Sequence, residues 1–225
     1  MGRTMFALNL FKNICAEGEH NAVFLTAECP DYKAIKLLKG MMENENYDMS
    51  DRIIDVATCE DVQTLFNIIR QVVEKQKVDV VILDSFHYLT LIDNFATPFL
   101  YESLADITRR MKQLAKKLSI TIIMTSRTNY MDEERHFNYI TKRPLLSDTD
   151  KMGDLAYYSD VVLGLYRPEV DSILVDTKGN DLHTVLYVLI LKSRRRIEDQ
   201  LVKFTMSSKN CNIAEVEKLP MKEYV

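Results

Sequence analysis

Three short stretches of the 225-residue sequence carry side chains that could handle a nucleotide and its metal ion. Asp84 ends the apolar run 78–85, and an aspartate at the carboxyl end of such a strand commonly holds hydrated Mg²⁺ in nucleotide-hydrolysing domains. Glu28 follows the apolar run 22–26, where a glutamate could act as a general base on water. Gly2-Arg3-Thr4 opens a helix in the manner of the last residues of a phosphate-binding loop.

Each stretch also has a simpler interpretation. Asp84 could cap a turn before Ser85, Glu28 could be an exposed charge after a strand, and the triplet at residues 2–4 could occur by chance. The usual lysine of a phosphate loop is replaced by Arg3. The arrangement of the whole chain therefore has to decide between these interpretations.

The apolar pattern predicts alternating strands and helices through the first half of the chain. Strands are expected at 22–26, 53–56, 78–85 and 120–125, and helices at 2–18, 30–42, 62–73 and 98–118. This alternation is typical of right-handed crossovers onto a parallel sheet. The carboxyl ends of the strands would then bring Glu28 and Asp84 to one edge, facing the start of the first helix.

The last third of the chain has a different pattern. Strands at 160–166, 185–192 and 201–206 are joined by polar turns, and we expect them to form an antiparallel edge of the same sheet. We expect one domain over residues 1–208 and a C-terminal tail over 209–225.

Two basic segments could contact anions. The segment 127–150 mixes arginines and lysines with aromatic residues, which suits a single nucleic-acid strand; a mobile loop of mixed charge is the alternative. The cluster 192–196 lies at a turn and could reach an anion on a neighbouring molecule, and a soluble charged turn is the alternative.

The composition limits the class of protein. Hydrophobic residues make up 47% and charged residues 28%, as in a globular protein, and the net charge of -4 argues against a general coat for nucleic acid. The four cysteines are scattered without metal-ligand spacing, which predicts reduced thiols. The sequence shows no apolar run that would span a bilayer and no secretory pattern, so we expect no membrane partner and a cytoplasmic location.

Taken together, these stretches resemble the C-terminal motor domain of DnaB-type replicative DNA helicases, which are RecA-like ATPases. The resemblance runs from Met1 to about Met206, and several motifs recur in the order of the family. They are residues 1–10, 23–28, 80–84, 111–115, 143–148, Gly153, 160–163, 165–167 and 192–194. The most specific match is Arg143-Pro144-Leu145-Leu146-Ser147-Asp148 with the strand that follows it.

The resemblance implies an α/β fold of the RecA-like three-layer type, with a mostly parallel central sheet and antiparallel strands at the C-terminal end. It implies an ATP-dependent helicase motor that moves along single-stranded DNA and assembles as a homo-oligomeric ring, with ATP and Mg²⁺ as cofactors. The site residues that it implies are Thr4 and Asp84 for Mg²⁺; Gly2, Arg3, Thr4 and Arg127 for the nucleotide; Glu28 and Asp84 for catalysis; Lys192 and Arg194 for the neighbouring subunit's ATP; and Arg135, Lys142, Arg143, Ser147 and Asp148 for DNA.

The sequence also departs from the family pattern. Arg3 replaces the lysine, Arg127 replaces a glutamine thought to sense nucleotide or DNA, and the first strand with the glycine-rich half of the phosphate loop would lie before Met1. We expect that strand to belong beside the 78–85 strand. The alternatives that remain are a non-catalytic RecA-like module that binds nucleic acid or a partner motor subunit, and a recombinase-like or clock-like ATPase of the same fold.

Overall fold

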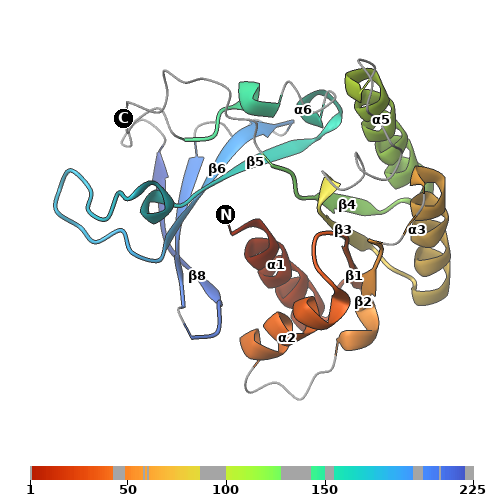
Figure 1. Cartoon of the computed structure of the whole chain (residues 1–225), viewed down its shortest axis with the longest axis horizontal. Helices are drawn as coiled ribbons and strands as arrows, with labels where there is room; N and C mark the ends of the chain where they lie inside the picture. Colours follow the sequence, from red (N-terminus) through yellow and green to blue (C-terminus); the bar gives the residue numbers. More distant parts are fainter. Residues whose placement is uncertain are drawn as a thin grey trace. The chain divides into compact units, whose positions relative to one another are not determined.

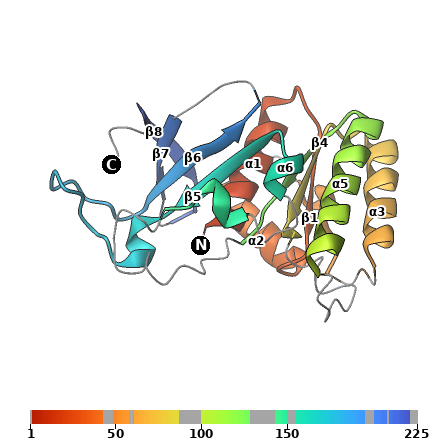
Figure 2. The same ribbon diagram turned by 90° about the horizontal axis from the view of Figure 1, so that it is seen from above.

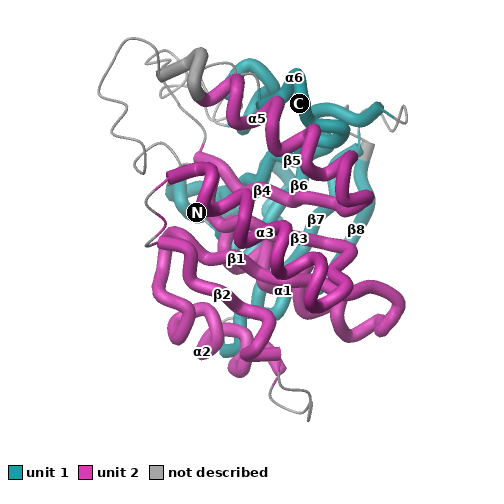
Figure 3. The backbone as a smooth tube through the Cα atoms, turned by 90° about the vertical axis from the view of Figure 1, so that its right-hand side faces the viewer, with its two compact units in different colours: residues 1–2, 128–225 teal, residues 3–127 magenta. Residues whose placement is uncertain are grey.

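The chain folds into two compact units. The parallel unit comprises residues 3–127, and the antiparallel unit comprises residues 1–2 and 128–225 (Figures 1 and 3). The computed structural model describes residues 2–42, 49–57, 59, 61–86, 100–127, 143–149, 155–194, 200–207 and 209–220.

The parallel unit is built on a four-stranded sheet with the order β2-β1-β3-β4. The strands are β1 (Ala22–Thr26), β2 (Ile53–Asp55), β3 (Val80–Asp84) and β4 (Thr121–Met124), and all three pairings are parallel. All five residues of β1 and all five of β3 are buried, which explains why both strands appear as continuous apolar runs in the sequence. The register pairs Thr26 with Asp84, so these two strands end at the same level.

Helices cover both faces of this sheet. Helices α1 (Arg3–Glu17) and α2 (Asp31–Met41) lie on one face, and α3 (Val62–Gln76) and α5 (Leu100–Leu118) lie on the other (Figure 2). Across the sheet, the connection from β1 through α2 to β2 runs in one direction, and the connections through α3 to β3 and through α5 to β4 run in the other. Because each crossover is right-handed, α2 lies on one face of the sheet, and α3 and α5 lie on the opposite face.

Local signals explain the outer helical layer. Asp61 is the N-cap of α3, because its side chain accepts a hydrogen bond of 2.5 Å from the backbone N–H of Thr64. Arg110 of α5 packs its guanidinium 4.7 Å from the ring centroid of Phe66 and donates a hydrogen bond of 2.9 Å to Gln63 Oε1, both on α3. These contacts join the two helices that lie behind β3 and β4.

The antiparallel unit is built on a second four-stranded sheet with the order β5-β6-β7-β8. Its strands are β5 (Val161–Tyr166), β6 (Val185–Ser193), β7 (Gln200–Met206) and β8 (Ile213–Pro220). Short helical segments η5 (Leu146–Thr149), α6 (Leu155–Tyr158) and η6 (Pro168–Asp171) precede or follow β5. The buried core of this unit consists of Tyr166, Leu182, Val185, Tyr187, Leu189 and Leu201.

The structure corrects three expectations about this architecture. The C-terminal strands form a sheet of their own, because within the described residues β5 to β8 pair only with one another. The expected tail contains β8, which pairs with β7 from Gln200↔Pro220 to Met206↔Ile213. The phosphate-loop strand has no open place beside β3, since β1 and β4 already pair with its two sides. A periodic pattern identifies a strand, but hydrogen bonding to particular neighbours decides which sheet it joins.

Candidate nucleotide site

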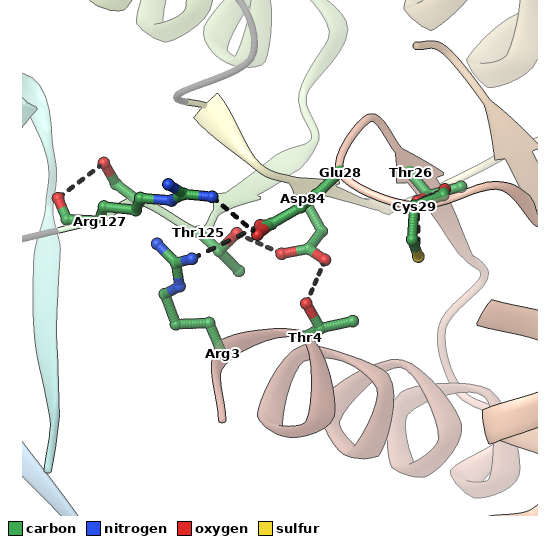
Figure 4. A network of polar contacts seen from close by, with 9 residues as sticks. Arg3, Thr4, Thr26, Glu28, Cys29, Asp84, Thr125 and Arg127 are labelled. Carbon is green, nitrogen blue, oxygen red and sulfur yellow. Dashed lines mark hydrogen bonds and ion pairs between the residues drawn. The ribbon is translucent and has the colours of Figure 1, made fainter. Parts of the chain in front are cut away.

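Asp84 lies at the centre of a polar network at the carboxyl end of β3 (Figure 4). The side chain is fully buried and accepts two hydrogen bonds from hydroxyl groups. Thr4 Oγ1, at the start of α1, donates to Oδ2 at 2.7 Å, and Thr125 Oγ1, directly after β4, donates to Oδ1 at 2.5 Å. Both carboxylate oxygens of this buried side chain therefore have a hydrogen-bond partner.

Glu28 is held next to Asp84 by backbone hydrogen bonds. The N–H groups of Ala27 and Glu28 donate to the carbonyl oxygen of Asp84, at 2.7 and 3.2 Å. The short loop after β1 is thus tied to the end of β3, as expected where two paired parallel strands end together. The predicted proximity of Glu28, Asp84 and Thr4 is present in the structure.

Two guanidinium groups contact the Glu28 carboxylate from different elements. Arg3 Nη2, on the first residue of α1, lies 3.5 Å from Oε2, and Arg127 Nη2, three residues after β4, lies 3.2 Å from Oε1. The exposed fractions of the side chains are 22% for Arg3, 25% for Glu28 and 55% for Arg127. Arg3 Nη1 is buried without a hydrogen-bond partner in the described part of the chain.

These residues fit a phosphate group and Mg²⁺. Thr4 and Asp84 offer oxygen atoms, the ligand type that Mg²⁺ prefers, and Mg²⁺ typically takes its other ligands from phosphate and water. The described residues contain no group of three or more His, Cys, Asp or Glu side chains that could hold a metal ion by themselves. The buried Nη1 of Arg3, at the N-terminus of a helix, suits an anion.

Gly2 has a backbone conformation that favours glycine. Its φ angle is +102°, and a Cβ atom added there would lie 3.3 Å from Cδ of Arg167. Arg167 pairs with Glu169, and burial lowers the pKa of the Arg167 guanidinium. A larger residue at position 2 would be strained at this point.

The predicted DNA residues are placed only in part. Arg143 is half-buried, Ser147 is exposed, and Asp148 is buried and accepts a hydrogen bond of 2.7 Å from the backbone N–H of Leu145. The Asp148 carboxylate therefore closes the turn in which it lies. Arg135 and Lys142 lie outside the described residues.

Lys192 and Arg194, predicted to reach a neighbouring subunit, both have partners within the antiparallel unit. The Lys192 ammonium donates to the carbonyl oxygen of Ala156 and, at 3.2 Å, to that of Tyr157, in α6. Arg194 Nη1 lies 3.0 Å from Asp160 Oδ1, and both of these side chains are more than half exposed. Lys192 thus binds backbone carbonyl groups of α6, whereas Arg194 forms an ion pair on the surface.

Sequence reasoning did not assign a role to Thr125. The sequence feature that could have indicated this role is a small polar residue at the carboxyl end of a strand expected in the same parallel sheet as β3. Because adjacent parallel strands end at the same edge of a sheet, a residue at that position can contact Asp84.

One protein family matches most of the chain. The family described as "DnaB-like helicase C terminal domain" matches residues 32–211 of the 225. The chain belongs to this family. The matched range begins after Arg3, Thr4 and Glu28, so for these three residues the site rests on the geometry described above.

Individual relatives of this DnaB-like domain are replicative helicases. A probable plasmid replicative DNA helicase from Chlamydia trachomatis is 25% identical over 214 residues, which cover 85% of this chain and 46% of the helicase. The replicative DNA helicase DnaB of Helicobacter pylori is 27% identical over 188 residues, covering 74% of this chain and 38% of the helicase. The chain thus spans less than half of the length of these helicases.

Two solved structures resemble this DnaB-like domain in fold. The ATPase domain of G40P has a TM-score of 0.72 at 20% identity, covering 96% of this chain and 81% of that domain. A KaiC-like protein from Pyrococcus horikoshii has a TM-score of 0.67 at 17% identity, covering 96% of this chain and 84% of that protein. Identities this low show the fold alone, and that fold is the RecA-like α/β architecture predicted from the sequence.

Within the described residues, no helix combines the length and the apolar character that crossing a bilayer requires.

Proposed function

We propose that this chain is the ATP-dependent motor domain of a replicative DNA helicase, which couples ATP hydrolysis to movement along single-stranded DNA. The observation that carries the proposal is the convergence of Thr4, Glu28 and Asp84 at one end of a parallel sheet. A hydroxyl, a buried carboxylate and a second, partly exposed carboxylate are the parts that a RecA-like site needs for Mg²⁺ and for water. Membership of the DnaB-like family supports this function.

Each residue of the site would have one task. Thr4 and Asp84 would hold Mg²⁺, which when bound neutralises charge that develops on the phosphates. The guanidinium of Arg3 and the amides at the start of α1 would receive phosphate oxygens. Glu28 would orient the attacking water and accept its proton, because its carboxylate is accessible whereas that of Asp84 is buried.

The wider assembly is also part of the proposal. We infer a homo-oligomeric ring in the cytoplasm, in which Arg194 contacts the ATP of the neighbouring subunit. Its ion pair with Asp160 is exposed, so little free energy is needed to separate the two side chains. Arg143 and Ser147, in the segment before β5, would contact single-stranded DNA together with Arg135 and Lys142.

A second function is favoured by one specific observation. Each carboxylate oxygen of Glu28 is paired with an arginine, and a general base engaged in this way is restrained from orienting water. A non-catalytic RecA-like module that binds nucleic acid or a partner motor subunit would have no need to release that base.

Nucleotide titrations separate these two functions. A fluorescent ATP analogue should bind the full chain, and its affinity should rise when Mg²⁺ is added. Glu28→Gln should retain binding and lose ATP hydrolysis in the presence of single-stranded DNA. Glu74→Gln, which changes an exposed glutamate on α3, is the matched control and should hydrolyse ATP normally.

The outcomes identify which function is wrong. If the wild-type chain binds no nucleotide with or without Mg²⁺, the motor function is rejected for this chain. If it binds nucleotide but single-stranded DNA elicits no hydrolysis, the non-catalytic module is the better description.

A further inference from the structure

Tyr157 carries the most exposed large hydrophobic side chain in the part of the chain that the structure describes, with 72% of it accessible. It belongs to α6, the short helix that precedes β5 in the antiparallel unit (Figure 1). A tyrosine side chain combines a large apolar ring with a polar tip, and such rings are common where a protein binds a partner. The ring of Tyr157 is therefore available to a ligand.

Hydrogen bonds from outside α6 fix the backbone that carries this ring. The backbone N–H and the hydroxyl of Ser159 donate to the carbonyl oxygen of Leu155, at 3.1 and 2.6 Å. The Lys192 ammonium donates to the carbonyl oxygens of Ala156 and Tyr157. Carbonyl groups that a helix of four residues leaves without intrahelical partners are thus satisfied by neighbouring residues.

The neighbouring Tyr158 restrains the ring itself. The centroids of the two rings are 5.0 Å apart and their planes meet at 89°, which is the T-shaped arrangement that aromatic pairs favour. A side chain that is already restrained loses less conformational entropy when a ligand covers it. Tyr157 is accordingly a preorganised aromatic surface.

This surface adjoins the segment that contains predicted DNA residues. Helix α6 contacts η5, which includes Ser147. Pro144, which directly follows Arg143, packs on β5, because a Cβ atom at Gly164 would lie 2.7 Å from its Cγ. Tyr157 therefore lies in the same region of the antiparallel unit as Arg143 and Ser147.

The charges in this region favour an anionic partner. Lys192 and Arg194 bring two cations to α6 and to the start of β5. The two described carboxylates nearby already have partners, since Asp148 accepts from a backbone N–H and Asp160 pairs with Arg194. An exposed aromatic ring beside cations is the combination that binds single-stranded nucleic acid, because phosphates are attracted to the cations while bases stack on the ring.

We propose that Tyr157 is a stacking site for a base of single-stranded DNA. This inference rests on the proposed DNA-binding function and deepens it, because it adds a base contact to the backbone contacts expected of Arg143 and Ser147. Every base has a π-face, so a stacking site accepts any sequence. A motor that moves along a strand can therefore use this contact with each base in turn.

The first test measures the affinity of the full chain for a labelled oligothymidylate by fluorescence anisotropy. Tyr157→Ala should weaken binding roughly 5- to 150-fold, the range expected when one base loses its stacking partner. Tyr157→Phe keeps the ring and should bind like the wild type. Tyr32→Ala is the matched control, because Tyr32 is 61% exposed on α2 in the parallel unit, and it should also bind like the wild type.

An abasic oligonucleotide of the same length tests whether the ring contacts a base. This strand has the same phosphates but offers no base for stacking. The wild type and Tyr157→Ala should therefore bind it with equal affinity, although they differ on oligothymidylate. An equal penalty on both strands would overturn the stacking site, because Tyr157 would then act on the DNA backbone or through the fold.

Salt dependence separates stacking from charge. Tyr157→Ala should keep the wild-type slope of log affinity against log salt concentration, because the ring neutralises no phosphate. Arg143→Gln should make that slope shallower by about 0.7, as expected when one contact to a single-strand phosphate is lost. A shallower slope in Tyr157→Ala would contradict a contact made by stacking alone.

The remaining outcomes are distinct. Wild-type affinity for oligothymidylate in Tyr157→Ala overturns the stacking site while DNA binding stands. A loss of affinity for an ATP analogue in place of DNA overturns it too, as does a change of oligomeric state in sedimentation that accounts for the weaker binding. If the wild-type chain binds no oligonucleotide, the DNA-binding part of the proposed function fails, and the stacking site fails with it.

Discussion

The hydroxyl of Thr4 donates a hydrogen bond of 2.7 Å to Oδ2 of Asp84, across 80 positions of sequence. This contact joins the start of α1 to the end of β3 inside a site where Asp84 is fully buried. It connects stability with function, because the two oxygens that stabilise the fold are also those that would hold Mg²⁺.

Thr4→Ala should lower the free energy of unfolding by about 1–3 kcal/mol, the usual cost when a buried polar group loses its partner. Urea denaturation measures this change. Thr4→Ser keeps the hydroxyl and should recover most of the lost stability. Equal stability of the alanine variant and the wild type would show that the hydrogen bond is replaced by water.

Asp84→Asn should make nucleotide affinity insensitive to Mg²⁺. The amide has the shape of the carboxylate, and the hydroxyls of Thr4 and Thr125 can rotate to hydrogen-bond with it, so the fold should survive. It lacks the negative charge that draws Mg²⁺. Titration of Mg²⁺ at a fixed concentration of a fluorescent ATP analogue measures the effect.

The control for this experiment is Asp79→Asn. Asp79 immediately precedes β3, and its carboxylate accepts a hydrogen bond of 2.9 Å from the backbone N–H of Asn21. Its side chain is 53% exposed, and the variant should keep the Mg²⁺ dependence of the wild type. An equal loss in both variants would contradict a specific role for Asp84.

Lys192→Met and Arg194→Gln should affect different properties. Loss of the Lys192 ammonium leaves carbonyl groups of α6 without their donor and should cost about 1–3 kcal/mol of stability. Arg194 is in an exposed ion pair, so its loss should cost less than about 1 kcal/mol, while ATP hydrolysis by the assembled protein falls.

Denaturation curves and ATPase rates measure the two effects separately. Lys178→Met, at an exposed turn, controls for placing a methionine on the surface. The assignment of Lys192 to a structural role fails if its variant is as stable as the wild type. The assignment of Arg194 fails if its variant hydrolyses ATP normally.

Gly164→Ala should disturb the segment that contains the predicted DNA residues. A Cβ atom at Gly164 would lie 2.7 Å from Cγ of Pro144 and 3.0 Å from Cδ1 of Leu191. Pro144 directly follows Arg143, so relief of this clash should move the segment away from β5. We expect a stability loss of about 1–3 kcal/mol and weaker binding of a labelled single-stranded oligonucleotide, measured by fluorescence anisotropy.

Gly40→Ala provides the matched control for that substitution. Gly40 lies in helix α2, and a Cβ atom there would have no neighbour within 4 Å. Alanine should therefore stabilise the chain by about 0.5–1 kcal/mol without changing DNA affinity. Weaker DNA binding by both variants would mean that the effect of Gly164→Ala is not local.

Much of the parallel unit could be predicted from local pattern. Continuous apolar runs identified β1 and β3, and helical spacing of apolar residues identified α3, whose cap Asp61 was found only in the structure. Because parallel strands end at a common edge, the predicted parallel arrangement was enough to place Glu28 and Asp84 at the same edge of the sheet. The strand β8 was missed, since most of its residues are exposed and it lacks a clear apolar pattern.

The sequence by itself determined the family, the alternation of strands and helices, and the residues that gather at the end of the parallel sheet. Only the tertiary structure decided that the C-terminal strands form a separate sheet, that Thr125 bonds to Asp84 and that Arg127 pairs with Glu28. The physical reason is the separation in sequence over which each kind of interaction acts. Periodicity and capping act over a few neighbouring residues, whereas strand pairing and ion pairing depend on which distant segments the folded chain brings together.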